Sequence, residues 1–379
     1  MPLTRARIST FGFFALNGFL LGMWVVHIPE ILDRTGTSTV TLGYLLLLMG
    51  GTALVGMQVG GRVIDRLGSR TVTVAAGLSL SVLLIGPALA TNVTGLAVAL
   101  GLLGAANGII DVAQNAQAVE VERAYGRPII SAFHAFFSLG GLLASLVGGA
   151  LIALDVDVRL ALGGAGLAGI VLALAARPGL MRSSIAPPPP TETSRAPWTT
   201  RVIILAALAF VLLLSEGVAY DWSTVHLHNS LHASKAVAAY AFGSFSVMMT
   251  LVRLLADRVV ARIGAAAYVQ RAAIVGAVGL LGASLAPNAV TAIIAWGVFG
   301  IGLAGCVPQF FSAAGNIDPA VSGTYLARVT GTGYLGLLAG PAIIGILTHW
   351  VPLTTAFAVP IVGCVAAGLL APRALRPAL

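Results

Sequence analysis

Polar residues gather in one segment of the chain that is otherwise mostly apolar. Asn107, Asp111, Gln114 and Asn115 occur between residues 107 and 117, and helical spacing places most of them on one face. A low-dielectric interior disfavours the charged form of a carboxyl group, so Asp111 is suited to bind and release a proton. The alternative is a structural role, in which these side chains join neighbouring helices through hydrogen bonds.

Single polar and aromatic residues in other apolar segments are further candidates. Glu216 is a second acid that could exchange a proton, or a protonated carboxyl that bonds a neighbouring helix. His134 is either a proton relay or a fixed hydrogen-bond donor. Trp24 and Trp222 could stack on the ring of a solute, or belong to an aromatic belt at a membrane interface. Asn17 matches Glu216 in an internal repeat of the chain.

The composition predicts that these residues lie within a lipid bilayer. The chain has 379 residues, of which 58% are hydrophobic and 9% charged, and its mean hydropathy is +0.97. A helix needs about 20 apolar residues to span a bilayer, so spans would use most of the chain. The 21 basic residues lie singly or in threes rather than along one face, which argues against a nucleic-acid partner.

Sequence patterns typical of enzymes and of metal proteins are missing. The chain contains no phosphate-binding loop or nucleophile triad, and Cys306 and Cys364 offer neither a metal-ligand spacing nor a disulfide framework. We therefore expect no enzymatic activity, no cofactor and no metal site. The two cysteines are expected to be packing residues.

Twelve apolar windows bounded by Gly, Pro and charged residues predict twelve membrane-spanning helices. A segment rich in Pro, Ser and Thr, with prolines at 187–190, separates the sixth window from the seventh. The predicted architecture is all-α, with a six-helix bundle at 1–178, a cytoplasmic linker at 179–200 and a second six-helix bundle at 201–379. The windows are 9–31, 38–60, 71–90, 95–118, 130–153, 159–176, 201–227, 236–256, 268–286, 289–313, 323–348 and 352–371.

The distribution of basic residues predicts the orientation. An even number of spans puts both termini on one side, and eighteen of the 21 basic residues are assigned to that side, Arg253 among them. The other side holds Arg34, Arg159 and Lys235. Because basic residues accumulate in cytoplasmic loops, both termini are expected in the cytoplasm.

The two halves resemble each other at an offset of about 196 residues. The repeat runs in the same direction in both halves, so the two bundles are expected to be pseudo-symmetric and parallel. Near the start of each half, Asn17-Gly18 followed by Trp24 matches Glu216-Gly217 followed by Trp222. The matched pairs at the common offset are Tyr44 with Tyr240, Gly101 with Gly297, Gly104 with Gly300, Gly140 with Gly336 and Gly149 with Gly345.

The segment 61–70 resembles the signature G-x-x-x-D-R-x-G-x-R of the major facilitator superfamily. Its matching residues are Gly61, Asp65, Arg66, Gly68 and Arg70. In that family the signature aspartate contacts the start of the eleventh span, here near residues 322–328, and holds the cytoplasmic gate shut. Asp65 is accordingly expected to accept hydrogen bonds from a helix N-terminus, where the dipole favours an anion. The alternative is a basic turn that sets topology, which explains the arginines but neither Asp65 nor the glycines.

A partial second copy of the signature follows the eighth window. Asp257 and Arg258 match its central pair, and Arg262 and Gly264 follow. Arg253 stands where the leading glycine would be. Because a long side chain replaces the small residue that close helix approach requires, packing at the second copy is expected to differ from packing at the first.

A closer resemblance is to the fucose-permease-like branch of the superfamily, particularly its YbjJ-like members. In fucose permeases an acid in the fourth span and a following asparagine serve proton coupling and sugar binding, and Asp111 and Asn115 match those positions. The second coupling acid of fucose permeases, in the first span, is absent, because Val25 stands about where it should be. Glu216 is the preferred replacement. The segments that carry the resemblance are Asn17-Gly18, Asp111 to Asn115, Phe133-His134 and Ser138 to Gly141.

Together these features predict a proton-coupled transporter of a small polar solute, working by alternating access between two halves. Its expected partners are the solute, protons and the lipid bilayer, and the chain is expected to be a monomer. Its expected place is the inner membrane of a bacterium. Proton-driven efflux of a drug or metabolite is one alternative, and a membrane sensor or assembly factor that does not transport is another.

Overall fold

The computed structural model describes residues 3–126, 129–182, 197–317 and 322–375, and its ordered elements in these ranges are helices. In this described part, twelve helical segments are long and apolar enough to cross a membrane. The prediction of an all-α protein with twelve membrane spans is therefore confirmed.

Each half contributes six spans, and several spans consist of two consecutive helices. The first half comprises α1 (Leu3–Thr35), α2 (Thr39–Leu67), α3 (Ser69–Leu83), α4 (Gly86–Leu89), α5 (Val93–Tyr125), α6 (Ile130–Ala153) and α7 (Val158–Ala176). The second half comprises α8 (Thr200–Val225), α9 (Lys235–Ile263), α10 (Ala265–Ser284), α11 (Ala289–Leu303), α12 (Cys306–Gly315), α13 (Ser322–Leu347), α14 (Leu353–Ala356) and α15 (Ala358–Leu375). A short π-helical turn, His226–Ser230, extends α8.

The sequence repeat is visible in the backbone where helices begin and end. Gly68 between α2 and α3 has φ 78° and ψ 151°, and Gly264 between α9 and α10 has φ 82° and ψ 153°. Residues other than glycine rarely adopt these backbone angles. Asn92 caps α5 by accepting from the Gly95 N–H, and Asn288 caps α11 in the same way. Gly68 and Gly264 are 196 residues apart, and so are Asn92 and Asn288. Equivalent helices in the two halves therefore begin or end at the same residue type.

Glycines at matched positions also let equivalent helices approach closely. A Cβ on Gly104 of α5 would collide with the Met49 carbonyl of α2, and one on Gly300 of α11 would collide with the Phe245 carbonyl of α9. Met49 and Phe245 are themselves 196 residues apart. The glycine pattern therefore specifies the same helix pair in both bundles.

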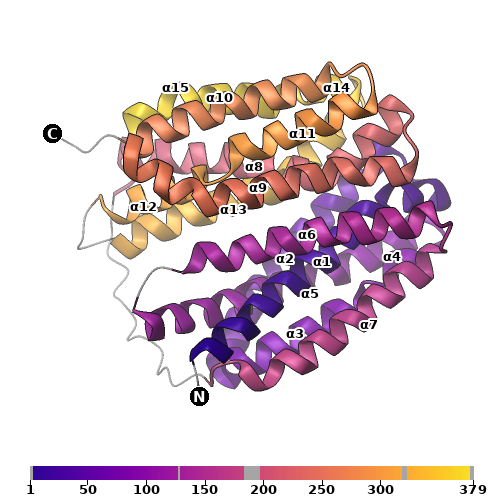
Figure 1. Ribbon diagram of the computed structural model, residues 1–379, viewed down its shortest axis with the longest axis horizontal. Helices are drawn as coiled ribbons and strands as arrows, with labels where there is room; N and C mark the ends of the chain where they lie inside the picture. Colours follow the sequence, from indigo (N-terminus) through magenta and orange to yellow (C-terminus); the bar gives the residue numbers. More distant parts are fainter. Residues whose placement is uncertain (1–2, 127–128, 183–196, 318–321, 376–379) are drawn as a thin grey trace.

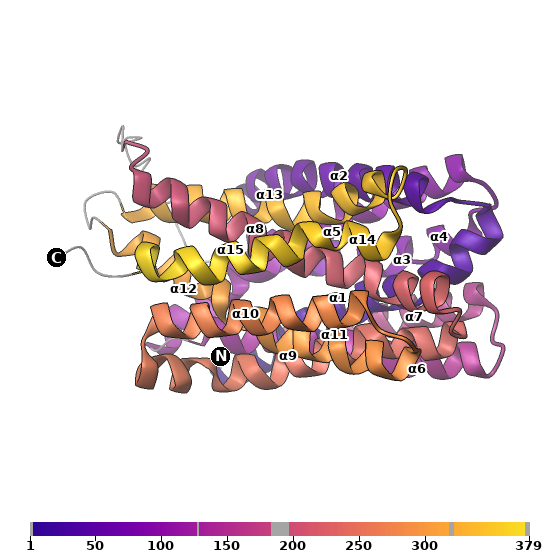
Figure 2. The ribbon, with the colours of Figure 1, turned by 90° about the horizontal axis from the view of Figure 1, so that it is seen from above.

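The two halves lie side by side along the long axis of the molecule, as Figures 1 and 2 show from two directions. Helix α1 begins and α15 ends at the same end of the molecule (Figure 1), which we call the terminal end. The halves contact each other mainly through α6 with α9 and through α2 with α13. Most of the predicted linker, residues 183–196, lies outside the described residues.

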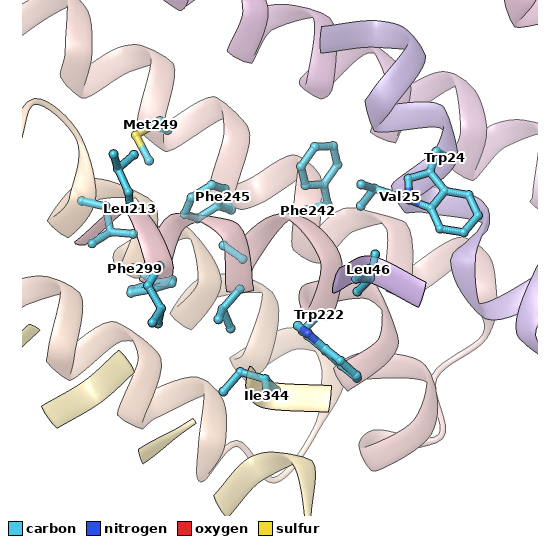
Figure 3. Close-up of a cluster of buried hydrophobic side chains, with 14 of the residues drawn as sticks. Trp24, Val25, Leu46, Leu213, Trp222, Phe242, Phe245, Met249, Phe299 and Ile344 are labelled. Atoms are coloured by element: carbon cyan, nitrogen blue, oxygen red, sulfur yellow. The ribbon is translucent and has the colours of Figure 1, made fainter. Parts of the chain in front are cut away.

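An apolar cluster joins the halves away from the terminal end. Figure 3 shows Trp24 and Val25 of α1 beside Phe242 of α9, and Leu46 of α2 near Trp222 of α8. All five side chains are buried. Helices α1, α2, α8 and α9 therefore share one core, and the polar residues described below border it.

Candidate functional site

Polar contacts between the two halves concentrate at the end opposite the terminal end, which we call the distal end. They join α1 to α8 and α9, the start of α2 to the end of α13, and α6 to α9. These contacts include Lys235 Nζ with Asp33 Oδ2 at 2.6 Å, Thr348 Oγ1 with Thr39 Oγ1 at 3.2 Å, Thr224 Oγ1 donating to the Val25 carbonyl at 3.0 Å, and Ser145 Oγ donating to the Ala239 carbonyl at 2.7 Å. The halves are thus closed against each other at the distal end.

Between these contacts and the terminal end lies a cavity of about 440 Å³. Its walls come from both halves, since side chains of α1, α2, α5 and α6 face side chains of α8, α9, α12 and α13 across it. A volume of this size is typical of sites for small molecules.

Four residues of the first half that line this cavity each have a buried polar atom without a partner. Asn17 Oδ1, Trp24 Nε1, Asn107 Oδ1 and Gln114 Oε1 are buried and have no hydrogen-bond partner among the described residues. All four residues line the cavity. A buried polar atom without a partner is costly, so four such atoms around one cavity indicate a place where a polar molecule supplies the missing bonds.

Asp111 lies in the cavity wall on α5. The Asn115 side chain donates to the Asp111 main-chain carbonyl at 2.8 Å and contacts Asp111 Oδ1 at 3.3 Å. Asn115 itself is not among the residues that line the cavity. Asn115 therefore orients Asp111 without lining the cavity itself, whereas Asn107 and Gln114 line the cavity with Asp111.

The strongest polar contact in the cavity wall lies in the second half. Arg253 Nη2 on α9 pairs with Glu216 Oε1 on α8 at 2.8 Å, and Arg253 Nη1 donates to Ser138 Oγ of α6 at 3.2 Å. The Tyr220 hydroxyl donates to Glu216 Oε1 at 3.3 Å. The guanidinium thus contacts both halves of the protein.

The assignment of Arg253 to the cytoplasmic end of a span is wrong. Its side chain is mostly buried and lines the cavity. The periodicity of α9 carried the signal, because Arg253 follows the cavity-lining Phe242 by eleven residues, close to three full helical turns. An arginine on the interior face of a span is expensive and usually functional, whereas the count of basic residues treated it as a topology marker.

The remaining predicted side chains divide between the cavity and the helix packing. His134 lines the cavity and meets the Phe14 ring edge-on at 5.2 Å. Trp24 lines it as well. Trp222 is buried against α13, where its Nε1 donates to the Pro341 carbonyl at 2.9 Å, and it is not part of the cavity lining. The two tryptophans therefore occupy different environments.

The signature residues lie apart from the cavity, at the terminal end. Asp65 and Arg66 are exposed, Arg70 is half-buried, and Gly61 has open space where a Cβ would be. Within the described residues, Asp65 makes no hydrogen bond or ion pair with α13. In the second copy Arg258 is exposed, and the Asp257 side chain lies outside the described residues. The predicted contact between Asp65 and the start of α13 is therefore not made by the described residues.

A buried network beside the signature was not anticipated from the sequence. Gln117 Nε2 contacts Ser69 Oγ at 2.6 Å, and Ser69 Oγ donates to Glu120 Oε1 at 2.8 Å. Gln117 also exchanges two hydrogen bonds with the Met181 backbone. The start of α3 is thereby fixed to α5 and to the segment that follows α7, which holds the signature turn in place.

Twelve spans in two similar bundles around a central cavity with a few polar groups in its wall define a membrane transport protein. The sequence profile of the Major Facilitator Superfamily matches residues 8–320, and the chain belongs to this family.

Relatives and solved structures agree with this membership. An uncharacterised MFS-type transporter of Yersinia pestis is 35% identical over 97% of this chain and 94% of its own length. Membrane protein MosC of Rhizobium meliloti is 27% identical over 93% and 86%. The nucleoside transporter NupG shares the fold with a TM-score of 0.70 at 15% identity, with complete coverage of both chains. A bacterial homologue of the human lysosomal transporter Spinster gives 0.68 at 15% identity, covering 99% of this chain and 96% of its own.

Proposed function

We propose that the chain is a proton-coupled secondary transporter that takes up a small polar solute, sugar-like or of another small organic kind, by alternating access. The observation that carries the proposal is that four residues lining one cavity between the halves each have a buried polar atom without a partner among the described residues. A solute with several hydroxyl or amide groups would satisfy them, whereas an apolar drug would leave them unpaired.

Asp111 is the proposed coupling acid. It is a carboxyl group in the cavity wall, next to the amides that are proposed to bind solute. Binding of a solute changes the polarity around a carboxyl, so loading and protonation would depend on each other. Glu216 is the proposed second acid, and its ion pair with Arg253 gives it a different environment from that of Asp111.

The branch resemblance and the basic residues support the remaining parts of the proposal. Asp111 and Asn115 match the coupling positions of fucose permeases, and NupG, which has the same fold, is a nucleoside transporter. We place the chain in a bacterial inner membrane, as a monomer with both termini in the cytoplasm, because basic residues crowd the terminal end. The cavity then faces the cytoplasm in this state, and engagement of Asp65 would accompany the outward-facing state.

The test has two stages. Purified protein is first screened by thermal unfolding against monosaccharides, polyols, nucleosides and sugar acids, because a ligand of the native state raises the melting temperature. Solutes that bind are then offered to proteoliposomes with an acidic exterior. Accumulation that a protonophore abolishes supports the proposal. Proton-driven loss of the solute from the vesicles would instead indicate efflux, and binding without any movement would indicate a sensor.

A further inference from the structure

Arg253 brings a permanent positive charge to the cavity wall. The Glu216–Arg253 pair is the strongest electrostatic feature there, and its two members differ in access: the Arg253 side chain is 21% exposed and that of Glu216 is 8% exposed. Both residues line the cavity, and Arg253 exposes the larger share of its side chain.

The guanidinium has unused capacity for hydrogen bonds. It donates to Glu216 and to Ser138 through one terminal nitrogen each, and the Tyr220 side chain is a further hydrogen-bond neighbour. Arginine carries more N–H donors than these two bonds use, arranged as a planar fork that fits two oxygens of a carboxylate or phosphate. The other titratable groups that line the cavity are Tyr220 of α8, Tyr334 of α13, His134 of α6 and the acids Asp111 and Asp221.

We propose that the solute carries an anionic group, a carboxylate or a phosphate, that takes the place of Glu216 on Arg253. This inference rests on the proposed transport function and names the class of its substrate. The unpartnered atoms of Asn17, Asn107 and Gln114 bind the hydroxyl groups of the same molecule. The substrate class is therefore a small hydroxy acid, a sugar acid or a sugar phosphate.

Charge balance in the low-dielectric interior explains how the exchange is driven. In this structure Glu216 neutralises Arg253. When the anion pairs with Arg253, a charged Glu216 beside it would leave one excess negative charge, which is costly away from water. Uptake of a proton by Glu216 restores neutrality. The anion and the proton thus enter together, and because Arg253 also contacts Ser138 of α6, the exchange takes place where the two halves meet.

The test compares solutes with one carbon skeleton and different charge. The full-length protein is titrated with glucose, glucosamine, gluconate and glucose 6-phosphate, and with a panel of hydroxy acids each beside its uncharged amide, while thermal unfolding is recorded. We expect anions to raise the melting temperature more than their uncharged counterparts. The carboxylate and phosphate arms show which anionic group the site prefers.

Two variants with opposite expected effects make the assignment to Arg253 specific. Arg253→Gln should weaken binding of the preferred anion about tenfold or more, the loss typical of a hydrogen-bonded charge, and should leave its uncharged analogue unchanged. Glu216→Gln should bind the anion at least as tightly as the unchanged protein, because Arg253 is then free. Arg271→Gln, an exposed arginine on α10, is the matched control. Arg253→Lys keeps the charge and should retain the preference for anions if Arg253→Gln does not fold.

A panel in which no anion stabilises the protein, or in which uncharged or cationic members bind better, overturns the inference. Equal weakening by Arg253→Gln and Glu216→Gln also overturns it, because that pattern belongs to a purely structural ion pair. Proton-driven uptake of a neutral solute would remove the anionic substrate and leave the proposed transport function standing. Anion binding without any vesicle uptake would contradict the proposed transport function and leave the anionic ligand standing.

Discussion

Lys235 at the start of α9 and Asp33 near the end of α1 form an ion pair of 2.6 Å that joins the two halves at the distal end. The Asp33 side chain is 58% exposed, so the pair is screened by solvent and contributes about 1 kcal/mol or less. It adjusts the closure of the distal end and does not hold it shut alone.

Breaking this pair should therefore shift the balance of states modestly. Lys235→Gln is expected to raise the rate at which an impermeant maleimide reaches a cysteine at Leu46, in the cavity wall, by about two- to fivefold, as a loss of up to about 1 kcal/mol implies. The native Cys306 and Cys364 are buried and should react little. The exchange of both charges, Asp33→Lys with Lys235→Asp, should return the rate towards its original value, and an unchanged rate in Lys235→Gln would contradict the role in closure.

Closure at the distal end should depend more strongly on a glycine contact. A Cβ on Gly43 of α2 would lie 2.6 Å from the Cα of Gly345 on α13, too close for any side chain. Gly43→Val is expected to abolish uptake and to increase labelling of the cavity from the distal side, because α2 and α13 can no longer meet. Gly51→Val on the same helix, where a Cβ meets nothing, is the control and should retain uptake. Normal transport by Gly43→Val would show that this contact is dispensable.

Asp111→Asn should separate coupling from binding. The amide keeps the size and the hydrogen bonds of the carboxyl but exchanges no proton, so accumulation against a gradient should be lost while counterflow between pre-loaded vesicles and medium persists. Asp155→Asn, an exposed loop carboxyl, should leave both assays unchanged. Proton-dependent accumulation by Asp111→Asn would exclude Asp111 and leave Glu216, the proposed second acid, as the coupling acid.

Asp65→Ala should impair transport and spare ligand binding. Asp65 lies outside the cavity and is exposed in the present state, so its loss is expected to affect only the state in which the terminal end closes. The measurements are uptake rate in vesicles and ligand affinity by thermal unfolding. A variant that loses affinity but cycles normally would place Asp65 in the binding site instead of the gate.

The orientation is open to a direct test with reporters. An alkaline phosphatase or fluorescent protein fused after Leu379, and one inserted near Ala186, should both report a cytoplasmic location, because arginines surround these positions. A periplasmic signal at only one site would contradict the model of twelve spans, and one at both sites would also reverse the proposed direction in which the cavity opens.

The sequence predicted the spans well because bilayer thickness and backbone hydrogen bonding leave few alternatives for long apolar segments. The repeat was equally readable, since Gly68 and Gly264 meet the same backbone requirement. The cavity was harder to predict. Basic residues near span ends are normally topology markers, which concealed Arg253, and the different environments of Trp24 and Trp222 depend on which neighbour each helix face meets, a tertiary property that periodicity alone does not contain.

The internal repeat has a final consequence for how a solute lies in the cavity. At the common offset the partner of Arg253 is Met57 and that of Asp111 is Val307, and all four residues line the cavity. The duplicated scaffold has thus diverged into two unlike walls, with amides and Asp111 on one side and the Glu216–Arg253 ion pair on the other. A solute that turned end over end would meet the wrong groups at both ends, so each molecule must cross in a single orientation, and mirror-image solutes should be distinguished.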